Sequence, residues 1–248
     1  DLVLDGVGAL DSAPVHGDSE SPDIGEDAVA DTPKELGQVR VLEACALPAA
    51  TQGVTCQTLE VACPGLDPLA VDLIIAEPAG EQLGVVILGS GSGGTGLYNA
   101  GVMSALVADG YRVLNRRWHG DWTAGTAGLR GAACRYATLA TWVRAQPWSE
   151  GPLCVSGNSG GAAEIAYVLS HWDLGDAIDL AVLSGGPPIA RLDLVCPSDS
   201  PWVQACSEVV PEAICGGVVN CAYNDGNYAL IDGAFDGTPC RDGEPLSL

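Results

Sequence analysis

Residues 153–165 read LCVSGNSGGAAEI, and this stretch decides the expected fold. Leu153–Ser156 is a short apolar run typical of a buried strand, and the small and apolar residues after Ser159 favour a helix. Gly157 and Gly161 flank Ser159 at the second position on either side. A sharp strand-to-helix turn needs such small neighbours, because the strand and the helix approach closely. We therefore expect the turn to strain the Ser159 backbone and to expose its hydroxyl at a helix N-terminus.

Strands and helices alternate along most of the chain around this turn. We expect strands at 39–42, 55–62, 69–76, 84–88, 111–115, 153–156 and 178–184. We expect helices at 98–109, 129–146 and 160–170. The strict alternation from residue 84 to residue 184 is typical of βαβ units, so we expect an α/β fold with a mostly parallel sheet.

A glycine-rich loop, GSGSGG at 89–94, follows the fourth of these expected strands. Many α/β-hydrolases carry H-G-x-G-G after their third strand, and the loop matches this motif with Ser90 in place of the histidine. The stretch 110–121 is similar to the family's next strand and the loop that follows it. Together with the turn at Ser159, these features make the chain resemble the α/β-hydrolase superfamily over residues 55–188.

The resemblance implies a three-layer α/β-hydrolase-type sandwich and a serine hydrolase that cleaves carboxylic esters. The serine of the turn is the nucleophile in this family, so Ser159 would carry the acyl group of an acyl-enzyme. The backbone N–H groups of Ser92 and Gly160 match the two donors of the family's oxyanion hole. The resemblance implies no cofactor and no metal. We expect the substrate to be a small-molecule ester, or an ester of a lipid or polymer.

The sequence does not supply the usual catalytic histidine. In the family an acid and then a histidine follow the nucleophile, but no histidine follows His171. His171 lies at the end of the helix that begins at the turn, and it should point away from Ser159. His119 is a weaker candidate for the base, since loops after parallel strands gather at one edge of the sheet. We expect that the base lies beyond Leu248; the alternative is a divergent member that lacks it. We assign no catalytic acid.

Composition limits the partners and the compartment. The formal net charge is −22 and Lys34 is the only lysine, so nucleic acid, which binds clustered cations, is not an expected partner. The ten cysteines contain no CxxC pair and there are three histidines, so a zinc site is poorly supported. A disulfide set in a secreted or cell-envelope protein explains the cysteines best, although buried free thiols would also fit.

Composition also divides the chain into three parts. Residues 1–38 hold ten acids and a single lysine, and we expect a disordered acidic leader there. Residues 39–188 form the expected hydrolase core. Residues 189–248 hold five cysteines and no long periodic run, which predicts a disulfide-rich cap or loop segment. No apolar run approaches the ~18 residues that span a bilayer, so no transmembrane segment is expected. The sequence does not indicate an oligomeric state.

Two other functions stay open at this point. A non-catalytic secreted binding module on a hydrolase scaffold would explain the missing base. An NADP-binding Rossmann oxidoreductase would use Gly91–Gly96, which reads G-x-G-x-x-G between a strand and a helix, with Arg116 or Arg117 beside the 2′-phosphate. The Rossmann interpretation leaves the turn at 157–161 unexplained, and cysteine usage points outside the cytosol, where dinucleotides are scarce.

Overall fold

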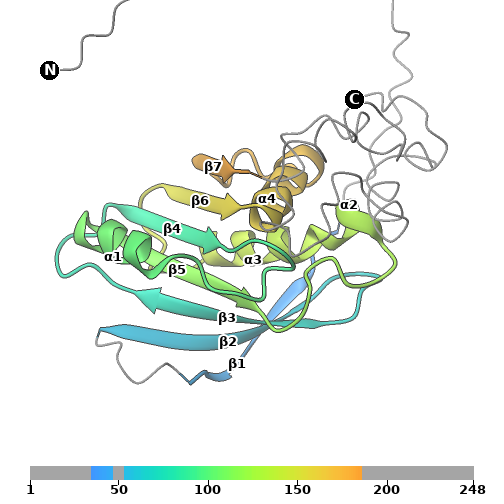
Figure 1. The fold of residues 1–248 in the computed structure, drawn as a ribbon, viewed down its shortest axis with the longest axis horizontal. Coiled ribbons are helices and arrows are strands. Elements are labelled where there is room, and N and C mark those ends of the chain that lie inside the picture. Colours follow the sequence, from blue (N-terminus) through green and yellow to red (C-terminus); the bar gives the residue numbers. More distant parts are fainter. Residues whose placement is uncertain (1–34, 47–52, 186–248) are drawn as a thin grey trace, which may run out of the picture. The chain divides into compact units, whose positions relative to one another are not determined.

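A computed structural model describes residues 35–46 and 53–185 of the chain (Figure 1). The segment expected to be a cysteine-rich cap, 189–248, lies outside the described residues, and so does the acidic leader up to residue 34. The folded part begins slightly earlier than expected. The first strand starts at Gln38, and the Gly37 N–H donates to Thr138 Oγ1 at 2.8 Å.

The described residues form a seven-stranded mixed sheet with the order β1-β2-β3-β5-β4-β6-β7 (Figure 1). The strands are β1 (Gln38–Ala44), β2 (Val54–Ala62), β3 (Leu69–Ala76), β4 (Gly84–Gly89), β5 (Tyr111–Trp118), β6 (Leu153–Asn158) and β7 (Leu180–Ser184). The pairs from β1 to β5 are antiparallel, and β5, β4, β6 and β7 are parallel neighbours. The loops after β4, β5 and β6 therefore lie at one edge of the sheet.

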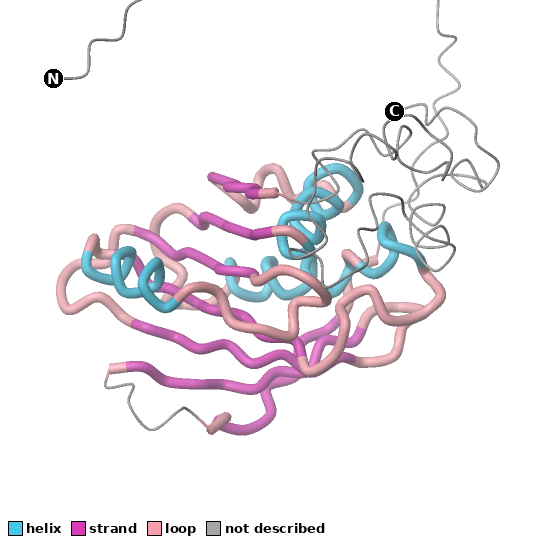
Figure 2. Tube along the Cα trace, in the orientation of Figure 1, coloured by secondary structure: helices cyan, strands magenta, loops and turns pink. Residues whose placement is uncertain are grey.

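Helices cover both faces of this sheet (Figure 2). They are α1 (Ala100–Ala108), α2 (Gly128–Ala132), α3 (Cys134–Arg144) and α4 (Gly160–His171). The helix α1 lies on one face, and α3 and α4 pack on the other, so the predicted three-layer α/β architecture is confirmed. The single helix expected at 129–146 is two helices, α2 and α3. Gly128 and Gly131 lie in the first of them, where glycine weakens helix formation.

The core lies on both faces of β4, an interior strand of the sheet that is buried along its whole length. Val85 and Ile87 belong to the larger apolar cluster under α3 and α4, and Val86 and Leu88 belong to the cluster under α1. Successive strand residues point to opposite faces, and so a strand covered on both sides is apolar at every position. This burial explains the uninterrupted apolar run that predicted a parallel strand.

Two disulfides link the described cysteines. Cys45, directly after β1, bonds Cys56 on β2, and Cys63, directly after β2, bonds Cys134 at the start of α3. Cys154 on β6 is a free thiol, and burial together with the charge of Asp179 raises its pKa. The prediction of disulfides is thus confirmed for two pairs among the described residues.

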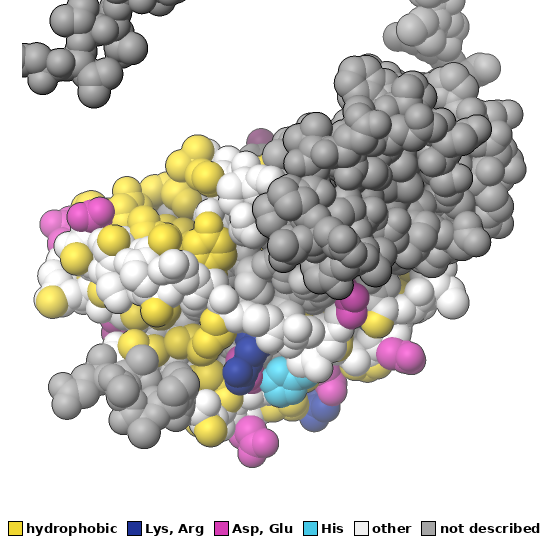
Figure 3. Space-filling model, viewed as in Figure 1, with side chains coloured by type: hydrophobic (Ala, Val, Ile, Leu, Met, Phe, Trp, Pro, Cys, Tyr) yellow, Lys and Arg dark blue, Asp and Glu magenta, His cyan; other side chains and the backbone are white. Residues whose placement is uncertain are grey.

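Apolar side chains gather on the exposed part of the face that carries α1 (Figure 3). Val102 on α1 and Leu180 and Val182 on β7 are all exposed there. In the described ranges, no helix has the length and apolar character needed to cross a membrane.

Candidate functional site

Ser159 stands at the turn between β6 and α4 with a strained backbone. Its φ of 51° and ψ of −116° lie in a region that residues with a side chain rarely adopt, and the residue is exposed. The Ser159 N–H donates to the Ser184 carbonyl at the end of β7 (2.9 Å), and its own carbonyl accepts from the Ala163 N–H (3.0 Å). These two bonds fix the kink from both sides.

The glycines beside Ser159 allow the strand and the helix to approach. A Cβ on Gly157 would overlap the backbone of Gly161 and lie 2.8 Å from the Ala162 nitrogen. A Cβ on Gly161 would lie 2.6 Å from the Gly89 carbonyl oxygen. Both distances are shorter than a carbon atom tolerates, so only hydrogen fits at these two positions.

The glycine-rich loop 89–94 lies directly against this turn. A Cβ on Gly91 would be 3.0 Å from the Cβ of Ser159. A Cβ on Gly160 would overlap the Ser92 carbonyl oxygen and would lie 3.0 Å from the Ser92 nitrogen. The structure thus brings together Ser159, Ser92 and Gly160. Within the described residues, neither the Ser92 amide nor the Gly160 amide donates a hydrogen bond.

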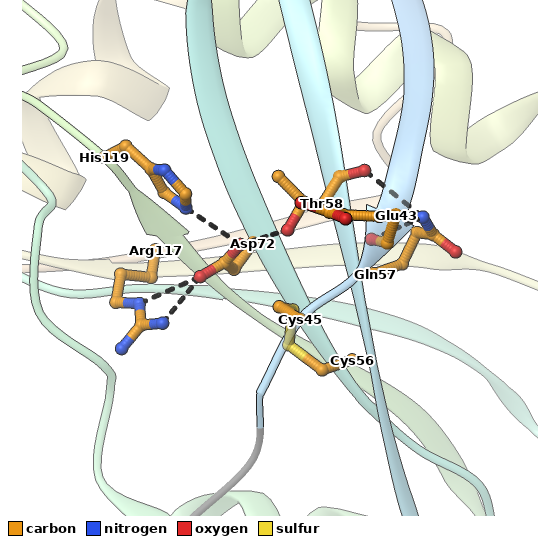
Figure 4. Close-up of a disulfide and its surroundings, with 8 residues drawn as sticks. All are labelled: Glu43, Cys45, Cys56, Gln57, Thr58, Asp72, Arg117 and His119. Atoms are coloured by element: carbon orange, nitrogen blue, oxygen red, sulfur yellow. Dashed lines mark hydrogen bonds and ion pairs between the residues drawn. A yellow bond between two sulfur atoms is a disulfide. The ribbon is translucent and has the colours of Figure 1, made fainter.

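His119 follows β5 and contacts Asp72 rather than Ser159. Its Nε2 lies 2.9 Å from Asp72 Oδ1, which also accepts from Thr58 Oγ1 at 2.7 Å, and Arg117 Nη2 donates to Asp72 Oδ2 at 2.6 Å (Figure 4). Asp72 is on β3, on the opposite side of β5 from β4 and β6. This contact directs the ring nitrogen toward β3, away from the Ser159 turn.

Asp72 is almost completely buried, and its neighbours stabilise the charged form of its carboxyl. Burial raises the pKa of this carboxyl, but hydrogen bonds from Arg117, Thr58 and His119 outweigh burial and lower the pKa below its ordinary value. The group is therefore a structural anion that joins β2, β3 and β5.

His171 lies at the end of α4, where its ring stacks on Tyr167 with 5.7 Å between the ring centroids. Ser159 sits at the other end of the same helix. In the part of the chain that the structure describes, no histidine is hydrogen-bonded to the Ser159 hydroxyl.

A buried charged group beside the loop was not predicted from the sequence. Arg116 on β5 and Glu164 on α4 are fully buried and form an ion pair, and Trp118 Nε1 donates to Glu164 Oε1 at 2.6 Å. Complete burial raises the pKa of Glu164, although the charge of Arg116 opposes this rise. In the sequence, Glu164 stands between apolar residues of an expected helix, and this context indicates a buried side chain.

Comparisons with known proteins give matches among solved structures alone. No protein-family model matches the sequence, and no curated protein matches it. Acetyl xylan esterase 1 from Thermoanaerobacterium sp. matches with a TM-score of 0.50 at 12% identity, over 82% of this chain and 68% of that chain. The chain has the α/β-hydrolase fold. The predicted resemblance is thereby confirmed at the level of the fold.

Two further solved structures are similar to this α/β-hydrolase fold. Brefeldin A esterase, a bacterial homologue of human hormone-sensitive lipase, matches with a TM-score of 0.47 at 21% identity, over 80% of this chain. The α/β-hydrolase GrgF from Penicillium sp. matches with a TM-score of 0.40 at 16% identity, over 62% of this chain. The chain spans 55% of brefeldin A esterase and 52% of GrgF, about half of each protein.

The helix after the glycine-rich loop of this α/β-hydrolase fold is not arranged for a dinucleotide. The helix α1 begins four residues after Gly96, and the side chain of Asn99 accepts the Gly101 and Val102 amides at its first turn. In a Rossmann unit, such first-turn amides bind the pyrophosphate. No group of three or more His, Cys, Asp or Glu residues within 35–46 and 53–185 is arranged to hold a metal ion.

Proposed function

We propose that this chain is a serine hydrolase that cleaves carboxylic esters through an acyl-enzyme on Ser159. The observation that carries the proposal is the strained, exposed Ser159 beside two amides, those of Ser92 and Gly160, that donate no hydrogen bond to another described residue. Strain at a polar residue marks functional sites, because the fold must hold it against a less costly conformation.

Each of these groups has a role in acyl transfer. The Ser159 hydroxyl gives its proton to a general base as its oxygen attacks the ester carbonyl carbon. That carbon becomes tetrahedral, and the carbonyl oxygen becomes an oxyanion. The N–H groups of Ser92 and Gly160 donate to that oxyanion, and each such donor contributes about 3–4 kcal/mol in enzymes from which one was removed. The intermediate collapses as the ester C–O bond breaks, the protonated base gives its proton to the leaving oxygen, the alcohol departs, and an acyl group stays on Ser159. Water then attacks the acyl-enzyme, releases the acid and regenerates the serine.

The net charge of the chain supports an uncharged or weakly charged ester as substrate. Its disulfides support a place of action outside the cytosol. The solved structure that matches with a TM-score of 0.50 is an acetyl xylan esterase by name, which supports an ester as substrate. A net charge of −22 disfavours polyanionic substrates through repulsion. The two disulfides support an oxidising compartment, in keeping with a secreted or cell-envelope protein.

Labelling with a fluorophosphonate probe tests this function. We expect stoichiometric modification at Ser159 and none in Ser159→Ala. Ser104→Ala is the matched control, because Ser104 is an exposed serine of α1 whose hydroxyl bonds the Ala100 carbonyl. Its labelling should equal that of the wild type. Equal labelling of the wild type and Ser159→Ala would contradict the proposal.

A second candidate function is a binding module on this scaffold, and one observation favours it. Among the described residues no histidine contacts the Ser159 hydroxyl, although a nucleophilic serine needs a base. A binding module would leave Ser159 unlabelled while the protein still bound an ester.

His119→Gln tests the remaining histidine candidate among the described residues. We expect the labelling rate to stay within about threefold of the wild type, because His119 contacts Asp72 and not Ser159. A loss of about 100-fold or more, the size expected for a general base, would instead make His119 the base.

A further inference from the structure

The buried pair Arg116–Glu164 lies beside the candidate site and has no role in the acyl-transfer steps. Both side chains are fully shielded from solvent. Taking two charges out of water is costly, and apolar side chains of similar volume often give equal or greater stability than a buried ion pair. Stability alone therefore does not explain why charged groups stand here.

The sheet is shaped to let Arg116 reach across it. In the sheet register, Gly89 on β4 pairs with Arg116 of β5 on one side and with Gly157 of β6 on the other. A Cβ on Gly89 would lie 2.6 Å from Arg116 Nη2. The missing side chain at Gly89 gives the guanidinium its path over β4 toward Glu164 on α4.

One guanidinium thereby joins the two segments that flank Ser159. Arg116 Nη1 donates to the Gly94 carbonyl in the glycine-rich loop at 3.1 Å, and Nη2 donates to Glu164. The backbone N–H of Trp118 also donates to the Gly94 carbonyl, at 3.0 Å. Gly94 lies two residues after Ser92, and Glu164 lies one helical turn after Gly160.

We propose that Arg116 and Glu164 are positioning residues that set the separation of the Ser92 and Gly160 amides. The inference rests on the proposed function, since it assigns these amides to the oxyanion. Arg116 acts through Gly94, and Glu164 acts through α4; neither side chain touches the substrate. Because the guanidinium is a rigid planar fork, it holds both acceptors in one fixed geometry, which a lysine ammonium does not.

The first measurement compares Arg116→Met and Glu164→Gln with the wild type in the hydrolysis of p-nitrophenyl acetate. We expect kcat to fall roughly 10–100-fold with KM within about threefold, because the amides stabilise the transition state more than the bound ester. Arg117→Met is the matched control. Arg117 is the next residue of β5, points to the opposite face and pairs with Asp72. Its kcat should stay within about twofold of the wild type.

The second measurement separates positioning from stability. In Arg116→Met combined with Glu164→Leu, no buried charge is left unpaired, so the urea midpoint should recover toward the wild type while kcat stays low. Arg116→Lys should recover only part of kcat, since it keeps the charge and loses the fork. A double variant with both wild-type stability and wild-type kcat would overturn the positioning role.

The outcomes also separate this inference from the proposed function. If the wild type is labelled at Ser159 and both single variants keep wild-type kcat, the positioning role is overturned and the function stands. If the wild type is neither labelled nor active, the proposed function is overturned, and the inference falls with it.

Discussion

At Gly157 the hydrogen side chain is a packing requirement, because a Cβ there would overlap the Gly161 backbone. We predict that Gly157→Ala lowers the free energy of unfolding by about 3 kcal/mol, the upper part of the range for overpacking. Urea unfolding followed by tryptophan fluorescence measures this change. At Gly175 nothing lies within 4 Å of an added Cβ, so Gly175→Ala should change the free energy by less than about 0.5 kcal/mol. Equal losses in the two variants would show that the turn is not tightly packed.

The ionisation of Asp72 makes the stability of the fold depend on pH. The pKa of its carboxyl in the folded protein is lowered from an ordinary value of 3.8, so the ionised form stabilises the fold above that value. This stability is lost as the pH falls through the lowered folded pKa. We therefore predict that Asp72→Asn is less stable than the wild type at pH 6, and that this difference shrinks as the pH falls from about 3.8 through the lowered folded pKa. Urea midpoints across this pH range test the prediction, and a difference that is constant with pH would refute it.

Some residues of the candidate site can be predicted from the sequence alone, and others can be identified only from the folded structure. Ser159, Ser92 and Gly160 are found from local motifs, because the turn and the loop each carry their signal within a few residues. The pair of Arg116 and Glu164 depends on contacts between segments 48 residues apart. No spacing rule gives such a contact, although a glutamate within an apolar helix and an arginine in a strand are signals of burial.

The strand β5 shows how tertiary contacts extend an element past its predicted end. The sequence predicts a strand at 111–115, and two arginines follow this range. In the structure β5 continues to Trp118. Arg116 is neutralised by Glu164 and Arg117 by Asp72, so both charges are accommodated. Neither partner is a neighbour in sequence, and the extension was therefore not predictable.

The disulfide between β2 and α3 is expected to stabilise the fold most. Cys63 and Cys134 are 71 residues apart, and the loop-entropy estimate for closing such a loop is about 4 kcal/mol. Replacing both by alanine should lower the free energy of unfolding by about that amount. The matched control replaces Cys45 and Cys56, which are 11 residues apart, for an expected loss of about 3 kcal/mol. Urea unfolding of both variants measures the difference, and a larger loss for the shorter loop would contradict the entropic account.

For the whole molecule, the sequence predicts the layers but not the order of the strands. Alternating strands and helices from residue 84 onward predict parallel pairing, and β4 to β7 confirm it. The placement of β5 between β3 and β4 arises from long-range pairing, which local patterns do not encode. The three antiparallel pairings of β1 to β5 were not predicted either, since strand signals carry no direction.

The proposed ester hydrolysis depends on a covalent intermediate at one serine, Ser159. The direct measurement is to mix the protein with p-nitrophenyl acetate, quench it within the first turnover and locate the added acetyl group by peptide mass spectrometry. We predict one acetyl group per chain on the peptide that contains Ser159, and none in Ser159→Ala. Ester hydrolysis with no acetylated Ser159, or with equal rates in Ser159→Ala, would contradict an acyl-enzyme on Ser159.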